Sequence, residues 1–597
     1  MATVLHRLED WFHSTPQAVA QRYREDDRWR DITVEDFRER VLALALFLES
    51  RGVSSDAVGV VFGPNSPAWV HADLATLLLG ARSAGIYPNS APKDISHILR
   101  HTEAQVLSVA NAEFYGKVKS ALGADPSVKV LLALDNDTSI HPSAVALSDA
   151  IDQGRQLFRD RGADYEMARF LGRIDPTAGA FLIYTSGTTG APKGALLSHD
   201  NLVFTSDRIA EVWKLPREKG SMFSFLPLCH IAEKLQSVGV GISLRYPISY
   251  CSKFERLAEE LPEVQPEVLL CVPRLWEKMK EGVERKLSQA PEPRRRLAEW
   301  AMHVGREALE ARLAGRGPGL ALTAQAALAE KLVLRKVRRA LGLEDARVVA
   351  SGAAALNAEV ARWFRGLGLE ILEDYGQTET TGVVSVTLPG MDCAGTVGKP
   401  VDGMDFRLAE DGEIQTRGRH VFVGYYKDEA ATSAVLKDGW CATGDLATFN
   451  ERGLLELRGR KKEILKTSGG KMVAPMPIEE KLKASPWISQ ACVVGDGRKY
   501  LGVLLTLSET ATAQLKERGV TWDSSAVTID SPEVQKEIQA VLDPINSELA
   551  SYEQLKRFAV LAREFSIESG ELTPTLKMKR SVVEQNYRSV IDAMIPS

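Results

Sequence analysis

The sequence has few cysteines, and their spacing fits neither a metal site nor a disulfide framework. The 597 residues include six cysteines, with no CxxC pair and no histidine at metal-ligand spacing: Cys229, Cys251, Cys271, Cys393, Cys441 and Cys492. Zinc sites and disulfide-rich folds need closely spaced ligands or paired cysteines. We therefore expect neither, and the composition favours the reducing cytosol.

The sequence also lacks a long apolar run and an excess of charge of one sign. Arg7 and Glu9 lie where a secretory signal would need an unbroken apolar core. The best apolar stretch, residues 74–79, is flanked by Asp73 and Arg82, so we predict neither export nor a membrane span. The net charge of -5, from 74 basic and 79 acidic residues, creates no field that would recruit nucleic acid.

The length and the pattern of apolar runs indicate at least two domains. Over the first 460 or so residues, short β-rich runs alternate with helical stretches, which is typical of layered α/β folds. One βαβ unit is predicted in detail: a strand at 347–350, a helix from the N-cap Asn357 through Phe364, and a second strand at 369–372. This unit would carry residues 373–381 to the carboxyl end of a strand, where open α/β sheets bind ligands.

After residue 460 the pattern changes to α+β. We expect a strand near Ile464, a helix from about residue 477, strands at 491–494 and 501–507, and further helices. The predicted domains are therefore residues 1–460 and 461–597.

Between residues 276 and 343 the sequence is helical in pattern and rich in arginine, with basic clusters at 294–296 and 335–339. A solvated helical insert explains this composition. A peripheral contact with anionic lipid headgroups explains it as well.

The segment 184–194, YTSGTTGAPKG, follows an apolar run and predicts a phosphate-binding loop. Its three glycines allow backbone N–H groups to converge on an anion, its four hydroxyls add donors and Lys193 adds positive charge. A Walker A loop would need glycine in place of Pro192 and serine or threonine in place of Gly194. The loop is therefore of another class.

The loop resembles the phosphate-binding signature of the adenylate-forming (AMP-binding) superfamily, which includes acyl-CoA synthetases, luciferases and peptide-synthetase adenylation domains. The resemblance extends over nearly the whole chain through blocks in the family's order: 226–233 (LPLCHIAE), 351–355 (SGAAA), 375–380 (YGQTET), 438–445 (DGWCATGD), 459–463 (GRKKE) and 572–577 (LTPTLK). It implies a large N-terminal domain of layered α/β sheets and a small, mobile α+β C-terminal domain.

The resemblance also assigns the residues that bind ATP and AMP. Asp445 and Arg460 are expected to hold the ribose, and Tyr375 to stack on adenine. The full set is Thr185, Ser186, Gly187, Thr188, Thr189, Gly190, Lys193, Ser351, Gly352, Ala353, Asp374, Tyr375, Gly376, Gln377, Thr378, Asp445 and Arg460.

Three catalytic positions follow from the same resemblance. Lys577, rather than Lys579, matches the family's catalytic lysine, whose ammonium stabilises charge as a carboxylate attacks the α-phosphate. His230 would border the carboxylate and acyl pocket, and Glu379 would bind Mg²⁺ with Thr188. The family's hinge falls on Lys462, and the expected coenzyme A channel is lined by Ser468, Gly469, Gly470 and Lys471.

Within the superfamily, the segments 230–234 (HIAEK) and 272–278 (VPRLWEK), the helical insert and the ending 572–577 resemble bacterial long-chain fatty acyl-CoA synthetases. This implies that ATP, Mg²⁺ and coenzyme A convert a fatty acid into acyl-AMP and then acyl-CoA. A medium-chain or aryl acyl-CoA synthetase and a fatty acyl-AMP ligase are the alternative functions. The sequence is compatible with either a monomer or a homodimer. A catalytically silent lipid-binding scaffold would predict damaged chemistry, yet Lys193, Glu379 and Lys577 are intact. We expect a cytoplasmic enzyme, with peripheral contact at the inner face of the membrane as one possibility.

Overall fold

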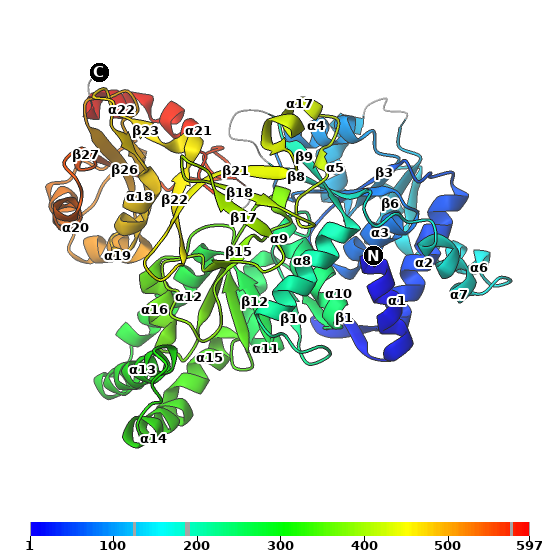
Figure 1. Ribbon diagram of the computed structural model, residues 1–597, viewed down its shortest axis with the longest axis horizontal. Helices are drawn as coiled ribbons and strands as arrows, with labels where there is room; N and C mark the ends of the chain where they lie inside the picture. Colours follow the sequence, from blue (N-terminus) through cyan, green and yellow to red (C-terminus); the bar gives the residue numbers. More distant parts are fainter. Residues whose placement is uncertain (1, 123–126, 186–190, 524, 574–576, 596–597) are drawn as a thin grey trace. The chain divides into compact units, whose positions relative to one another are not determined.

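The computed structural model describes residues 2–122, 127–185, 191–523, 525–573 and 577–595. These residues form two compact units (Figure 1). Unit 1 holds the described residues up to 185 together with 191–406 and 415–442, and unit 2 holds 407–414 and the described residues from 443 on. The chain passes between the units within strands β17 (Asp405–Leu408), β18 (Glu413–Arg417) and β21 (Trp440–Phe449).

Unit 1 contains an eight-stranded sheet that is mostly parallel. Its strands, in order across the sheet, are β19 (Gly424–Tyr425), β9 (Lys193–Ser198), β8 (Gly179–Thr185), β4 (Arg82–Ile86), β3 (Val58–Phe62), β5 (Val106–Val109), β6 (Val130–Ala133) and β7 (Ala144–Ala146). β8 and β9 form an antiparallel hairpin in which Thr185 lies opposite Lys193. The hairpin therefore places the two described ends of the predicted phosphate loop side by side.

A nine-stranded sheet forms the second layer of unit 1. Its order is β16 (Lys399–Pro400), β15 (Ser385–Val386), β14 (Ile371–Tyr375), β13 (Val348–Ser351), β12 (Val268–Cys271), β10 (Met222–Ser224), β11 (Ile248–Tyr250), β1 (Val19–Glu25) and β2 (Arg28–Thr33). The strands from β14 to β1 are parallel, and antiparallel pairs close both edges. This confirms the predicted α/β layering.

Helices α3 (Pro67–Leu78) and α8 (His199–Val212) begin at serine N-caps, Ser66 and Ser198, whose side chains accept backbone N–H bonds. Nearly every residue of α3 is buried, as expected for a helix enclosed by other elements. The remaining helices of the first half are α1 (Val4–Ser14), α2 (Val34–Ser50), α4 (Pro92–Thr102), α5 (Ala112–Leu122), α6 (Leu147–Leu157), α7 (Ala163–Leu171), α9 (Ile231–Glu233), the π-helix η2 (Lys234–Gly241), α10 (Ile242–Leu244) and α11 (Leu257–Val264), with short 3₁₀ turns η1 (Thr138–Ile140) and η3 (Phe254–Arg256).

The predicted βαβ unit is present. β13 and β14 are parallel neighbours, and α16 (Ala358–Arg365) lies between them in sequence. The Asn357 side chain accepts a hydrogen bond from the N–H of Glu359 and caps α16, as the sequence predicts. The strand boundaries are shifted by one to three residues.

The segment between β12 and β13 is helical, as predicted. It consists of α12 (Pro273–Ser288), α13 (Glu292–Leu313), α14 (Leu320–Ala329), the π-helix η4 (Glu330–Leu334) and α15 (Arg335–Leu341). α13 carries a buried stripe that includes Ala301 and Val304, which packs into a core shared with Trp276 of α12 and Phe364 of α16. The insert is therefore anchored in unit 1.

Unit 2 follows the predicted α+β order. After β22 (Leu455–Arg460) come the turn η6 (Lys461–Glu463), the pair β23 (Leu465–Lys466) and β24 (Met472–Val473), α18 (Pro475–Lys483), and a sheet of β25 (Ile488–Val494), β26 (Leu501–Leu507) and β27 (Leu555–Leu561). Helices α19 (Glu509–Glu517) and α20 (Pro532–Glu548) precede β27, and α21 (Arg580–Asn586) and α22 (Arg588–Met594) follow it. The shorter elements β20 (Leu436–Lys437), α17 (Glu429–Val435) and η5 (Thr378–Thr380) belong to unit 1.

Candidate active site

The carboxyl ends of β13 and β14 bring two predicted nucleotide segments together. Ser351 lies beside Glu373 in the strand register, so residues 351–353 and 374–378 leave the sheet side by side. A Cβ added at Gly352 would stand 2.4 Å from Asp374 Oδ1, so a larger residue here would displace the Asp374 side chain. Ala353 has φ of +70°, a left-handed conformation that costs a non-glycine residue about 1–3 kcal/mol. Backbone strain and close approach thus both occur at the predicted nucleotide segment.

Ser351 provides a second sign of a ligand at this edge. Its side chain is 1% exposed, and among the described residues Oγ has no hydrogen-bond partner. A buried hydroxyl without a partner costs about 1–3 kcal/mol. A bound ligand with a polar atom would satisfy it.

Glu379 lies in η5, close to the phosphate-loop hairpin. The Tyr425 hydroxyl donates a 2.6 Å hydrogen bond to Glu379 Oε1. Burial and the neighbouring Glu379 raise the pKa of Tyr425 above its ordinary value, so the phenol keeps its proton and remains a donor. Lys193 Nζ lies 5.2 Å from the centre of the same ring and 3.9 Å from an oxygen of Asp428. Tyr425 therefore connects the loop lysine to the predicted metal ligand.

His230 is held at the start of α9. Its Nδ1 accepts the backbone N–H of Ala232 at 3.1 Å, and its ring meets that of Tyr87 edge-on with the centres 6.4 Å apart. The half-buried imidazole is thereby fixed immediately before the helical segment that lines the cavity described next.

An apolar pocket, partly open to solvent, lies among α8, η2 and the nine-stranded sheet. Its lining includes the apolar residues Trp213, Met222 and Val240. It also includes Asp374, Gly382 and Val383, which belong to or follow the predicted nucleotide segment in sequence. Burial raises the pKa of Asp374 to about 7. An apolar cavity beside a polar ligand edge is the usual form of a small-molecule site.

Gln236 is a polar residue with no charge in this largely apolar lining. It is 6% exposed, and among the described residues neither atom of its carboxamide has a hydrogen-bond partner. A substrate chain that fills the cavity would exclude the water that such a group needs. Gln236 would therefore be left without a hydrogen-bond partner by an apolar ligand in this pocket.

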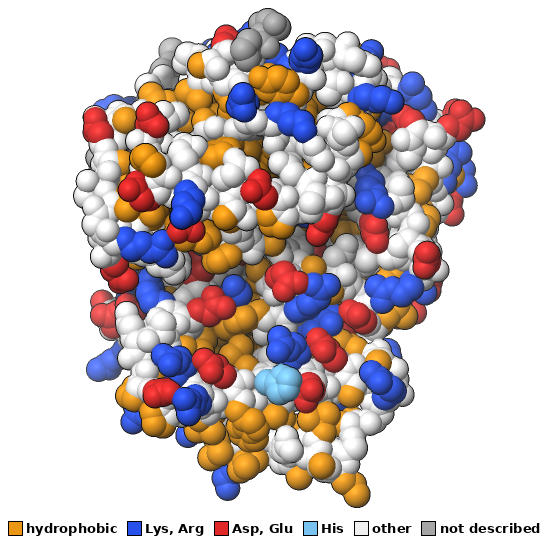
Figure 2. Space-filling view, turned by 90° about the vertical axis from the view of Figure 1, so that its left-hand side faces the viewer, with side chains coloured by type: hydrophobic (Ala, Val, Ile, Leu, Met, Phe, Trp, Pro, Cys, Tyr) orange, Lys and Arg blue, Asp and Glu red, His pale blue; other side chains and the backbone are white. Residues whose placement is uncertain are grey.

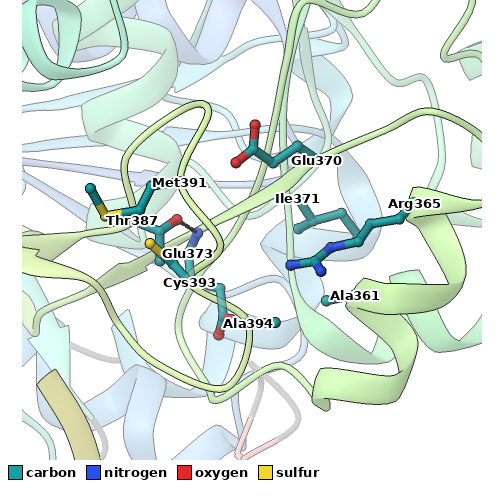
Figure 3. A pocket seen from close by; sticks show the side chains of 9 residues that line it. All are labelled: Ala361, Arg365, Glu370, Ile371, Glu373, Thr387, Met391, Cys393 and Ala394. Atoms are coloured by element: carbon teal, nitrogen blue, oxygen red, sulfur yellow. Dashed lines mark hydrogen bonds between the residues drawn. The ribbon is translucent and has the colours of Figure 1, made fainter. Parts of the chain in front are cut away.

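A smaller hollow of about 310 Å³ lies on the other side of β14 (Figure 3). Successive strand residues face opposite sides, so Glu373 lines this hollow while Asp374 lines the apolar cavity. Arg365 is paired with Asp392 at 2.5 Å, and Glu370 accepts the backbone N–H of Gly390. These charged groups have protein partners, so their chemistry is structural.

Unit 2 contains the other predicted site residues. Asp445 and Arg460 lie opposite each other on β21 and β22, with Arg460 Nε 3.0 Å from Asp445 Oδ1. The carboxylate side chain is 11% exposed and the guanidinium 49% exposed. The pair thus presents an acceptor and a fork of donors at one place on the hairpin.

Two hydrogen bonds join Thr573 to Lys577. The Lys577 N–H donates to Thr573 Oγ1 at 3.0 Å, the Thr573 N–H donates to the Lys577 carbonyl, and Lys577 is exposed. Arg580 is buried and forms a 2.7 Å ion pair with Glu479. Arg580 is therefore fixed in the core of unit 2, whereas Lys577 is exposed to solvent.

Lys462 lies in the turn η6 between β22 and β23. The predicted channel segment is a tight turn in which Gly470, at φ of +78°, donates its N–H to the Thr467 carbonyl. Ser468 donates its N–H to the carbonyl of Arg498, and Lys471 lies over the Tyr552 ring.

Two family models match this sequence. The AMP-binding enzyme model matches residues 8–426, and the AMP-binding enzyme C-terminal domain model matches residues 462–596. The chain belongs to the AMP-binding enzyme family. The predicted superfamily is confirmed.

Relatives of this AMP-binding enzyme share most of its length. It is 35% identical over 575 residues to the long-chain-fatty-acid–CoA ligase FadD15 of Mycobacterium tuberculosis, covering 95% of this chain and 93% of that protein. It is 31% identical over 565 residues to the long-chain-fatty-acid–CoA ligase ACSBG2 of Gallus gallus, covering 89% of this chain and 73% of that one.

Solved structures share the fold of this AMP-binding enzyme at lower identity. The anthranilate CoA ligase AuaEII in complex with anthranoyl-AMP matches with a TM-score of 0.73 at 19% identity, covering 98% of this chain and 97% of that chain. The o-succinylbenzoate CoA synthetase MenE of Bacillus subtilis matches with a TM-score of 0.68 at 17% identity, over 97% of each chain. The predicted large α/β domain with a C-terminal domain is therefore confirmed as the fold.

The structure of this AMP-binding enzyme brings some predicted residues together. Lys193 and Glu379 both contact Tyr425, and Thr185 lies opposite Lys193. Ser351, Gly352 and Asp374 lie at one strand edge, followed in sequence by Ala353, Tyr375, Gly376, Gln377 and Thr378. The loop residues Ser186, Gly187, Thr188, Thr189 and Gly190 fall outside the described residues. Sequence reasoning missed Tyr425 and Gln236.

Proposed function

We propose that this protein is an AMP-forming ligase that activates a long-chain fatty acid as acyl-AMP and transfers the acyl group to coenzyme A. The products are acyl-CoA, AMP and pyrophosphate. The observation that carries this proposal is the apolar pocket whose lining includes Asp374, next to the strained nucleotide segment. Similarity to long-chain-fatty-acid–CoA ligases over 95% of the chain supports it.

In the first step, the acid carboxylate attacks the α-phosphate of ATP and pyrophosphate leaves. Lys193 and the loop would hold the β- and γ-phosphates, and the Lys577 ammonium would stabilise charge at the α-phosphate. His230 would orient the carboxylate at the mouth of the cavity, while Ser351 and Tyr375 would contact the base. Asp445 and Arg460 would bind the ribose hydroxyls.

Glu379 and Thr188 are the proposed Mg²⁺ ligands. Glu379 suits this role because Oε2 accepts no hydrogen bond among the described residues, while Tyr425 fixes Oε1. The described residues contain no cluster of three His, Cys, Asp or Glu side chains suited to a metal, and phosphate oxygens normally complete such a Mg²⁺ site. When bound, Mg²⁺ neutralises charge on the leaving pyrophosphate.

The second step needs a thiol at the carbonyl of acyl-AMP, close to the position of Lys577 in the first. We therefore propose a domain boundary between residues 460 and 461 with Lys462 as the hinge. Residues 461–597 would rotate so that Ser468, Gly469, Gly470 and Lys471 line the coenzyme A channel. We expect the reaction to take place in the cytoplasm. The mass of the protein in solution would distinguish a monomer from a homodimer.

A panel of acids from acetate to oleate tests the proposal. AMP and pyrophosphate release are measured with and without coenzyme A. We expect the highest kcat/KM for long chains and acyl-CoA formation only with coenzyme A present. A preference for short or aryl acids would favour the other synthetases, acyl-AMP that never passes to coenzyme A would favour an acyl-AMP ligase, and no AMP release would favour a silent lipid-binding scaffold.

A further inference from the structure

α14 is an exposed helix with an apolar outer face. Residues 317–329 carry no charged side chain. The inner side of the helix packs against unit 1 through Leu322, Ala326 and the buried Ala329. On the outer side, Leu320 is 94% exposed, and Leu328 and Leu332 are 50% and 39% exposed. A helix exposed to water normally carries charge on that face.

The three leucines form one surface. Leu320, Leu328 and Leu332 are spaced by multiples of four residues, which places them along one side of the continuous helix formed by α14 and η4. In Figure 2, hydrophobic side chains gather at the lower end of the molecule, where α13 and α14 lie in Figure 1. We call the side chains of Leu320, Leu328 and Leu332 the leucine face.

The segment that carries the leucine face is rich in cations. Residues 292–341 contain eleven Lys and Arg against five Asp and Glu, although the whole chain has a net charge of -5. Several of these arginines form ion pairs, such as Arg335 with Glu344. The exposed Arg312, Arg316, Lys331 and Lys336 form no ion pair within the part of the chain that the structure describes.

We propose that the leucine face inserts into the headgroup–acyl boundary of an anionic lipid bilayer, with Arg312, Arg316, Lys331 and Lys336 contacting the headgroup phosphates. The ten residues of α14 span about 15 Å, half of the roughly 30 Å of a bilayer core, so the helix lies along the surface. No helix among the described residues has the length and apolarity for a membrane crossing.

The charge around the face selects this partner over a second copy of the chain. Two leucine faces brought together would place their unpaired cations against each other, which disfavours self-association. An anionic surface instead attracts each cation. The basic insert predicted from sequence thus has both an electrostatic and an apolar means of binding lipid.

The test is sedimentation of the full-length protein with vesicles. We expect binding to vesicles of mixed phosphatidylglycerol and phosphatidylcholine, weaker binding as salt rises, and little binding to pure phosphatidylcholine. Replacing both Leu320 and Leu328 by glutamate should lower the partition coefficient by at least about tenfold. Leu157→Glu is the matched control, because Leu157 is 48% exposed on α6, and it should bind as the unmodified protein does.

Two further measurements keep the outcome clear. Leu328→Trp fluorescence should be quenched by lipids brominated on the acyl chain, which reports insertion without a disruptive charge. Activity on an acid dispersed in solution should be the same in the glutamate variant, which separates this inference from the proposed reaction. Equal binding of the glutamate variant, equal binding to neutral vesicles, or a dimer that the glutamate variant dissociates would overturn the proposal.

Discussion

Replacing Gln236 by leucine removes a buried carboxamide from the lining of the apolar cavity. Gln236 is 6% exposed with no partner for its carboxamide among the described residues. An unsatisfied buried amide costs about 1–3 kcal/mol, and a fatty chain that fills the cavity removes any water that could relieve this cost. Leucine has a similar size and no polar atoms. We therefore expect kcat/KM for a saturated long-chain acid to rise about tenfold, which corresponds to about 1.4 kcal/mol.

The assay compares palmitate with a chain-hydroxylated acid. Because leucine offers no hydrogen bond, the gain should be confined to the saturated acid. Ser243→Ala is a matched control, since Ser243 Oγ is also buried without a partner among the described residues but does not line the cavity. It should leave acid kinetics unchanged. A Gln236→Leu variant with unchanged or lower kcat/KM for palmitate would refute the reasoning.

Four further predictions follow from the site. Asp445→Ala should lower kcat/KM for ATP by about 2–4 kcal/mol, because it removes charge-assisted hydrogen bonds to the ribose; unchanged ATP kinetics would contradict the assignment. Lys577→Ala should abolish acyl-AMP formation yet still convert supplied acyl-AMP to thioester, whereas Lys462→Pro, with φ fixed near −65°, should do the reverse. If both variants lose the same half-reaction, the hinge is misassigned. Tyr425→Phe removes the hydrogen bond that orients the proposed metal ligand, so the Mg²⁺ concentration for half-maximal rate should rise about tenfold or more, against an unchanged KM for the acid. Asp374 has a folded pKa of about 7, above its unfolded value, so its burial costs stability as pH rises from about 4 to 7. Asp374→Asn should therefore gain stability relative to the unmodified protein over that range in thermal unfolding scans, and a constant difference would exclude the ionisation.

The sequence predicted those parts of the fold in which local signals and periodicity agree. The helix capped by Asn357 and its flanking strands are present because a side-chain cap and two glycines define that helix. The apolar run before the glycine-rich segment forms β8, as predicted, whereas its antiparallel pairing with β9 was not predicted. The order of the motifs identified Glu379 and Lys193 as candidate site residues. It did not identify Tyr425, the residue that contacts both of them.

Other features depend on contacts that no local pattern contains. Tyr425 reaches Glu379 because β19 pairs with β9, more than two hundred residues earlier in the chain. Gln236 stands in an apolar helical run, and only the packing of η2 against the sheet shows that it lines a cavity. The arginines of the insert are visible in sequence, whereas the exposure of Leu320 depends on which side of α14 packs inward.

The central claim is that one site forms an acyl-AMP and then consumes it with coenzyme A. The most direct measurement is a single turnover with excess enzyme, oleate and ATP labelled in the α-phosphate, first without coenzyme A. We expect labelled oleoyl-AMP and one pyrophosphate, and, after coenzyme A is added, conversion of all the label to AMP together with oleoyl-CoA. Release of ADP, or oleoyl-AMP that persists after coenzyme A is added, would contradict the account.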